Sequence, residues 1–153
     1  MADRREMILA RLEAIAQSFD GFTTVGRNLV DLPDDALPAL VVVDGDEETI
    51  DDAEGVAKRP PAQHRLMQMR PEIVAILIGA PEALGPDLQG LRAKMVSAVL
   101  SDTTLKSASY VLHERMTYEG CETQGGVTGR GVVCGMRMNF TFTYLFRPTD
   151  LVA

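Results

Sequence analysis

Residues 3–19 form the first patterned segment of the chain, because apolar side chains recur there at helical spacing and polar side chains fill the positions between them. The recurring apolar positions are Ile8, Leu12, Ile15 and Phe19. Gly21 follows within FDGF and can adopt the left-handed conformation that commonly ends a helix. The pattern predicts an amphipathic helix at the start of the chain.

Residues 136–146 show a different period. Apolar side chains occupy every second position from Met136 to Phe146, and Arg137, Asn139, Thr141 and Thr143 alternate with them. A period of two over eleven residues predicts a long, half-buried strand whose aromatic and thioether face points inward.

Weaker patterns predict the remaining elements. Strands are expected within residues 22–30, 39–44, 66–79 and 108–118, and a second helix from Pro86 to about Ser101. Pro71 is expected at the beginning of its strand or on an edge strand, because proline cannot donate a backbone hydrogen bond. The order α-β-β-β-α-β-β predicts a single α+β domain over residues 1–153. We expect a mostly antiparallel sheet of four to five strands covered by two helices.

The amino-acid composition agrees with a globular α+β domain, and the charged residues are distributed unevenly along the chain. The chain has 153 residues, 46% of them hydrophobic and 24% charged, which is ordinary globular composition. No apolar run reaches the roughly 18 residues that a membrane span needs, so we expect no membrane association. Residues 1–60 carry 6 Lys and Arg against 14 Asp and Glu, whereas residues 61–153 carry 9 against 8. The acidic half argues against binding of nucleic-acid backbone.

Residues 44–63 are predicted to be an acidic loop with paired prolines. Six of its carboxylates are candidate interaction residues: Asp44, Asp46, Glu47, Glu48, Asp51 and Asp52. A calcium loop of the EF-hand type starting at Asp44 would need glycine at Thr49 and glutamate at Gly55. The sequence therefore predicts no metal site here, and either a partner surface or a solvated loop accounts for the carboxylates.

Residues 119–131 are glycine-dense and are predicted to be a flexible loop or hairpin tip. A phosphate-binding loop would need Lys followed by Ser or Thr after the last glycine, and here VVCGM follows Gly131. Cys121 and Cys134 flank this stretch; they are expected to be free thiols, with a disulfide as the alternative if a hairpin places them opposite one another. We expect no enzymatic activity, catalytic residue or cofactor.

The whole chain resembles the tail terminator (tail completion, minor tail protein U-like) proteins of long-tailed bacteriophages. The resemblance is carried by REMILARLEAI, RNLVDLPDDALPALVVVDGDE, MRPEIVAILIG, LQGLRAKMVSAVL and MNFTFTYLF, in that order. It implies a structural virion protein at the head-proximal end of the tail, assembled in the bacterial host cytoplasm. Such proteins form a ring, usually a hexamer, that caps the tail tube, stops its polymerisation and joins the head.

The resemblance also implies partners. These are further copies of the chain, the tail-tube protein and a head-completion or connector protein, while DNA passes through the ring without specific binding. We expect the six acidic residues to face the lumen or a partner rim, and Gly125, Gly126 and Arg130 to contact the tube or connector. Two alternatives stay open: a neighbouring head–tail connector or tail-tube role, and a regulatory domain that binds a metal or ligand through the acidic loop.

Overall fold

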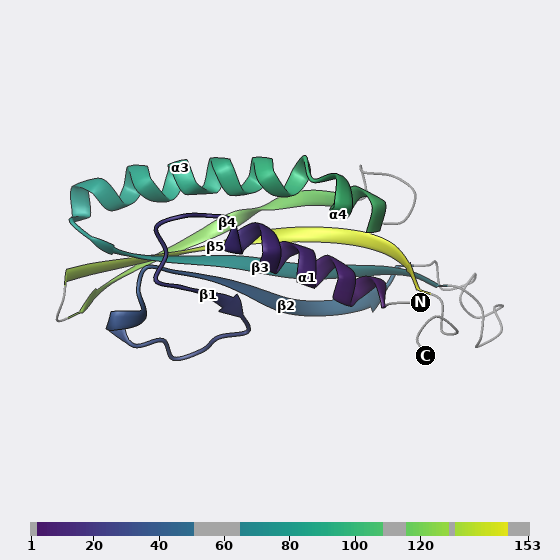
Figure 1. Cartoon of the computed structure of the whole chain (residues 1–153), viewed down its shortest axis with the longest axis horizontal. Coiled ribbons are helices and arrows are strands. Elements are labelled where there is room, and N and C mark those ends of the chain that lie inside the picture. Colours follow the sequence, from purple (N-terminus) through teal and green to yellow (C-terminus); the bar gives the residue numbers. More distant parts are fainter. Residues whose placement is uncertain (1–2, 51–64, 109–115, 129–130, 147–153) are drawn as a thin grey trace.

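A computed structural model describes residues 3–50, 65–108, 116–128 and 131–146 of the chain. It confirms the predicted α+β class. A five-stranded sheet in the order β1-β2-β3-β5-β4 lies under helices on one side (Figure 1). The helices are α1 (Arg4–Gln17), α3 (Pro81–Leu100) and the short α4 (Thr103–Ala108), with a 3₁₀ turn, η1 (Asp34–Ala36), between the first two strands.

The strands are β1 (Thr24–Arg27), β2 (Ala39–Thr49), β3 (Arg65–Gly79), β4 (Met116–Thr128) and β5 (Gly131–Phe146). β1 pairs with β2 in parallel, and every other pair is antiparallel. A parallel pair cannot be joined by a tight hairpin, and residues 28–38 cross from the end of β1 to the start of β2 through η1. The expected element order is therefore confirmed, with α4 as an addition after the second helix.

The core lies between the helices and one face of the sheet. The predicted inward face of β5 is confirmed, since Met136, Met138, Phe140, Phe142 and Tyr144 are all at most 1% exposed. They pack with the apolar faces of α1 and α3, from which Leu12 and Met95, among others, are fully buried. Burial of large aromatic side chains dominates the energetics of a core of this size.

The opposite face of β5 departs from the expected pattern at two positions. Thr141 and Thr143 are buried although they alternate with the core residues. Thr143 lies opposite Gln68 in the register, so a short side chain stands beside a longer one on the neighbouring strand. Arg137, by contrast, is exposed as expected.

The second helix begins earlier than predicted. The sequence places its start after Pro86, but α3 begins at Pro81 and contains Pro86 in its interior. Pro81 occupies a first-turn position, where the missing N–H costs nothing, and Leu84 extends by one turn the buried face that Leu88 continues. Burial of this face outweighs the hydrogen bond that Pro86 cannot donate.

Pro71 was expected at a strand start or an edge strand, and that prediction is wrong. β3 is a central strand that pairs with both β2 and β5. The proline is accommodated because the register of β2 against β3 shifts between Val43 and Asp46. Gly45 forms this bulge with φ +70°, and its backbone approaches Arg70 and Pro71 closely. A bulge leaves ladder groups unpaired, so a residue without an N–H is tolerated there.

The two predicted loops are largely strands. Residues 44–49 continue β2, so the assignment as a loop is wrong over those residues. Residues 119–128 belong to β4, which pairs antiparallel with β5 up to Thr128 opposite Gly131, so the loop interpretation is wrong there and the hairpin alternative is confirmed. Residues 51–63 lie outside the described part of the chain, as do residues 109–115 of the strand predicted over residues 108–118. Ala108, the first residue of that prediction, ends α4 instead. Within the described residues, none of the helices is long and apolar enough to cross a membrane.

Candidate functional site

The bulge at Gly45 distributes the acidic residues of β2 over both faces of the sheet. Side chains alternate along a strand, and one extra residue reverses the alternation beyond it. Asp44 consequently points to the helix side, and so does Glu47, which pairs with the buried Met69. Asp46 lies opposite Arg70 and Glu48 opposite Gln68 on the other face. The candidate carboxylates therefore do not share one surface.

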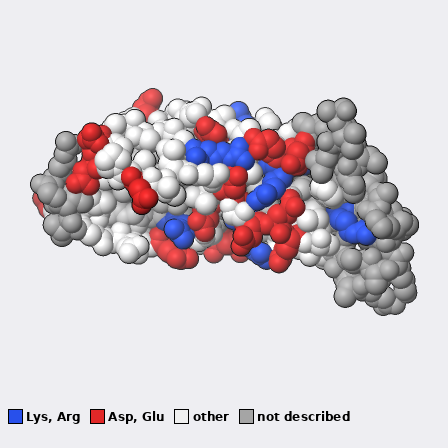
Figure 2. Space-filling view, turned by 90° about the horizontal axis from the view of Figure 1, so that it is seen from below, with Lys and Arg blue, Asp and Glu red and all other residues white. Residues whose placement is uncertain are grey.

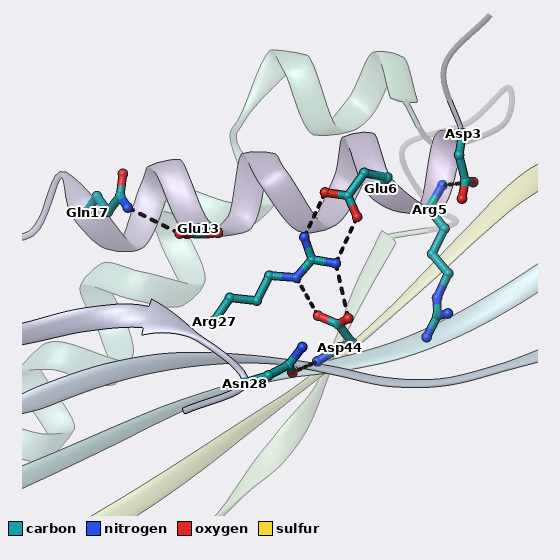
Figure 3. Close-up of polar contacts among 8 residues, drawn as sticks. All are labelled: Asp3, Arg5, Glu6, Glu13, Gln17, Arg27, Asn28 and Asp44. Atoms are coloured by element: carbon teal, nitrogen blue, oxygen red, sulfur yellow. Dashed lines mark hydrogen bonds and ion pairs between the residues drawn. The ribbon is translucent and has the colours of Figure 1, made fainter. Parts of the chain in front are cut away.

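On the helix side, Asp44 belongs to a network of charges that joins three elements. Arg27 of β1 donates to Asp44 through Nε at 2.6 Å and through a terminal nitrogen at 3.0 Å. The same guanidinium donates to both carboxylate oxygens of Glu6 on α1, at 2.7 and 2.8 Å. Figure 3 shows Arg27 between the two carboxylates. Hydrogen bonds from Arg27 hold the pKa of Asp44 and that of Glu6 below their usual values.

The network also closes the edge of β2 where β1 ends. The backbone N–H of Asp44 donates to Oδ1 of Asn28 at 3.0 Å, and Arg5 donates to the carbonyl of Gly45 at 2.7 Å. These side chains satisfy groups that a neighbouring strand would otherwise bind. Asp44 thus supports the fold, which makes it a poor candidate for a lumen or partner contact.

Glu47 also lies on the helix side of the sheet, where its surroundings disfavour the ionised carboxylate. Its carboxylate is 3.9 Å from Nε of Arg5, and burial raises its pKa. Nε of Arg5 is itself buried and has no hydrogen-bond partner. The pKa values of Asp44 and Glu47 shift in opposite directions because Arg27 donates hydrogen bonds to the carboxylate of Asp44, whereas a terminal nitrogen of Arg5 donates to the backbone carbonyl of Gly45.

The face of the sheet away from the helices is the candidate functional surface, and we call it the helix-free face. None of the described helices packs on it. Its side chains come from alternate positions of β2, β3, β5 and β4. They are Asp46, Glu48, Gln68, Arg70, Glu72, Val74, Ile76, Val133, Arg137, Asn139, Glu119, Glu122 and Gln124, and the glycines Gly126 and Gly135 add open positions.

Two hollows lie on this face. The first, of about 500 Å³, has an apolar floor of Val74, Ile76 and Val133, and Gly135 contributes no side chain to it; we call it the apolar hollow, although Glu122, Gln124 and Arg137 also line it. The second, of about 570 Å³, is polar and is lined in part by Asp46 and Arg70. Apolar and charged areas therefore lie side by side on one sheet face, an arrangement typical of protein contact surfaces.

Arginines are interleaved with the carboxylates of the helix-free face. Arg70 pairs with Glu48, and Arg137 lies 3.3 Å from Glu72. On the surface seen from below in Figure 2, Lys and Arg are likewise mixed with Asp and Glu over the middle of the molecule. The acidic segment is therefore partly neutralised, which sequence order alone does not reveal.

The structure brings only some of the predicted interaction residues together. Asp46, Glu48 and Gly126 lie on the helix-free face, whereas Gly125, opposite Cys134, belongs to the helix side; both glycines border the first hollow. Asp51, Asp52 and Arg130 lie outside the described residues. Sequence reasoning missed Arg27 and Arg70, because no local pattern pairs an arginine with a carboxylate on another strand.

The cysteines are not opposite one another. Cys121 pairs with Met138 and Cys134 with Gly125, so they are four residues apart along β5, a distance of about 13 Å. A disulfide needs Cα atoms within about 7 Å. Both thiols are free, and the alternative of a disulfide between them is wrong for this fold.

In the part of the chain that the structure describes, no group of three or more His, Cys, Asp or Glu side chains is placed to hold a metal ion. His64 and His113 lie outside that part. No model of a known protein family matches the chain, and no curated protein is significantly similar to it.

Proposed function

We propose that this protein is a structural assembly subunit of the tail terminator type, which forms a ring on the last tier of a tail tube and offers a surface to the head. The observation that carries the proposal is the helix-free face. A whole side of a five-stranded sheet carries an apolar hollow beside a charge-mixed strip. A surface of this kind favours a binding partner over solvent.

The sheet edges supply a second means of assembly. β4 has 13 residues and pairs only with β5, so its outer edge has no strand partner among the described residues. The side chains of residues 121–126 are all exposed. An edge of this length can accept a strand from a neighbouring subunit, and a contact between two different surfaces of identical subunits closes into a ring.

The positions of the predicted interaction residues in the fold leave only some of them as candidates for contact with a partner or the lumen. Asp46 and Glu48 on the helix-free face stay candidates for the lumen or a partner rim, where carboxylates would repel DNA phosphates. Asp44 and Glu47 face the helices and are assigned to the fold instead. The glycines Gly125 and Gly126 border the apolar hollow and are candidates for contact with the tube or connector.

The test is the oligomeric state, followed by the effect on tubes. Light scattering coupled to gel filtration should give a mass several times 16.7 kDa, and negative-stain microscopy should show rings. Added to polymerising tail-tube protein, the ring should bind at one end and stop elongation. A chain that stays monomeric at all concentrations and leaves tube length unchanged would contradict the proposal.

The effect of deleting the protein on tail assembly distinguishes a tail terminator from a tail-tube protein. Without a terminator, tails become overlong or headless, whereas without a tube protein no tails form. A double variant Asp46→Lys/Glu48→Lys should impair assembly or DNA passage, whereas unchanged particle yield would reduce these carboxylates to a solubility role.

A further inference from the structure

Three carboxylates of the helix-free face have no counter-ion. Glu48 and Glu72 are paired with arginines, but Asp46, Glu119 and Glu122 form no ion pair with any described residue. Glu119 accepts a hydrogen bond from the hydroxyl of Thr117, which leaves its charge uncompensated. Arg137 stands opposite Glu122 and Arg70 opposite Asp46 in the register, but these arginines form their salt bridges with Glu72 and Glu48. The carboxylates named on this face outnumber its arginines, so the face has a net negative charge that favours a cationic partner.

These carboxylates lie next to the apolar hollow. Glu122 lines the hollow itself, whereas Asp46 and Glu119 line the polar hollow beside it. Gly135 stands between Ile76 and Gln124 in the sheet register, so the hollow is open where a side chain would otherwise stand. A Cβ atom at Gly135 would meet nothing nearer than 3.8 Å. The hollow therefore accepts a side chain from a partner without rearrangement.

The distance between successive side chains on one face of the sheet matches the repeat of an extended peptide ligand. Gln124 with Gly135, Glu122 with Arg137, and Gly120 with Asn139 follow one another along β4 and β5. Residues of one face repeat about every 6.7 Å along a strand. An extended peptide has the same repeat, so alternate side chains of one bound segment can reach the hollow and then the carboxylates.

Charge argues against the exposed apolar segment of a second copy, as far as the described residues show it, as the occupant. Among the described residues, the exposed large apolar side chains are Met7, Leu29 and Val30, and Val30 is 78% exposed. The segment that presents Leu29 and Val30, residues 28–38, contains three Asp and no Lys or Arg. Its insertion into the hollow of another copy would place carboxylates against carboxylates.

We propose that the helix-free face binds an extended segment of a different protein, in which aliphatic side chains are followed by Lys or Arg at alternate positions. An aliphatic side chain occupies the hollow over Gly135, and the cations face Glu122 and Glu119, with Asp46 further along. The inference rests on the proposed function in one respect, since it identifies this partner with the tube or head-completion protein.

The probe is a fluorescein-labelled, capped peptide of sequence VSVSKSK, measured by fluorescence anisotropy with the full chain. Binding should be lost with VSVSESE. The variant Glu119→Gln/Glu122→Gln should weaken binding about fivefold, as expected for the loss of two exposed charge pairs. The matched control Glu82→Gln/Asp87→Asn removes two exposed charges from α3 and should leave the Kd within twofold. Equal weakening by both variants would mean general attraction to an acidic protein and would overturn the proposal.

Gly135→Val provides the test of the hollow. It should abolish binding by filling the space, whereas Gly90→Ala on α3, where a Cβ atom meets no neighbour, should not. In the wild type, the peptide should shift amide resonances of β3, β4 and β5 around Ile76 and Glu122. Unchanged affinity in Gly135→Val, or shifts confined to the helix side, would overturn the assignment. Because rings and tube capping are measured without the peptide, failure of either proposal is recognised separately.

Discussion

The guanidinium of Arg27 holds the carboxylate of Asp44 through two hydrogen bonds, from Nε to Oδ1 at 2.6 Å and from a terminal nitrogen to Oδ2 at 3.0 Å. This pair ties β1 to β2 at the point where β1 ends, and Glu6 extends it to α1. Charge-assisted, bidentate pairs are among the stronger polar interactions in proteins. The residue that begins the acidic segment is therefore part of the framework of the domain.

Removal of the charge should lower the stability of the protein at Asp44 but not at Glu47. Asp44→Asn should lower the free energy of unfolding by about 1–2 kcal/mol, because it weakens hydrogen bonds to a charged group. Glu47→Gln should change it by less than about 0.5 kcal/mol or raise it, because burial disfavours that carboxylate in the folded state. Urea denaturation at pH 7 measures both. An equal loss in the two variants would contradict the assignment of Asp44 alone to the framework.

Acid should destabilise the protein as its paired carboxylates protonate. Arg11 donates to both oxygens of Asp102, which also caps α4 at the N–H of Leu105. The folded-state pKa values of Asp44 and Asp102 are lowered mainly by their arginine partners. The stability that they contribute is therefore fully present above the unfolded-state pKa of about 4 and is lost as the pH falls through the lower folded-state values.

The double variant Asp44→Asn/Asp102→Asn tests this pH dependence. Denaturation curves collected from pH 6 down to pH 2 should show a smaller loss of stability in the variant than in the wild type. Glu47, whose pKa is raised, contributes in the opposite direction, since its ionisation disfavours the folded state as the pH rises. Parallel curves for wild type and variant would show that other groups control the acid response.

Replacement of Gly45 by alanine should be severely destabilising, whereas replacement of Gly90 should not. A Cβ atom at Gly45 would lie 2.0 Å from the carbonyl oxygen of Arg70, and the residue has φ +70°. Gly45→Ala should therefore cost more than about 2 kcal/mol of unfolding free energy or prevent folding. Gly90 lies in α3, an added Cβ atom there meets no neighbour within 4 Å, and no proline follows it, so Gly90→Ala should raise stability by about 0.5–1 kcal/mol. Thermal unfolding distinguishes them, and a tolerated Gly45→Ala would argue against the bulge.

Replacement of Tyr144 by phenylalanine should increase the stability of the protein. Its side chain is fully buried in the core, and its hydroxyl has no hydrogen-bond partner among the residues that the structure describes. A buried hydroxyl without a partner costs about 1–3 kcal/mol, so Tyr144→Phe should raise the unfolding free energy by about 1 kcal/mol. Phe142→Leu, which removes aromatic volume from the same strand face, should lower it instead. A destabilised Tyr144→Phe would reveal a partner for the hydroxyl in solution.

The sequence by itself determined the elements whose pattern is local and long. The helical period before Phe19 and the alternation from Met136 to Phe146 each state which side of the element is apolar, and burial then enforces that side. These two elements and the order of the rest are sufficient for the α+β class. Pro86 led to a wrong boundary for α3, because the one unfavourable backbone position was outweighed by an added turn that buries Leu84.

Only the tertiary structure decided which face each carboxylate of β2 occupies. The run from Asp44 to Glu48 reads as a loop because it is polar, and its place in β2 depends on pairing with β3, far away in the sequence. The bulge at Gly45, opposite Arg70 and Pro71, then reverses the alternation, so that Asp44 meets Arg27 and Glu48 meets Arg70. Strand register is a property of two chain segments together, and a one-residue shift moves every later side chain to the other face.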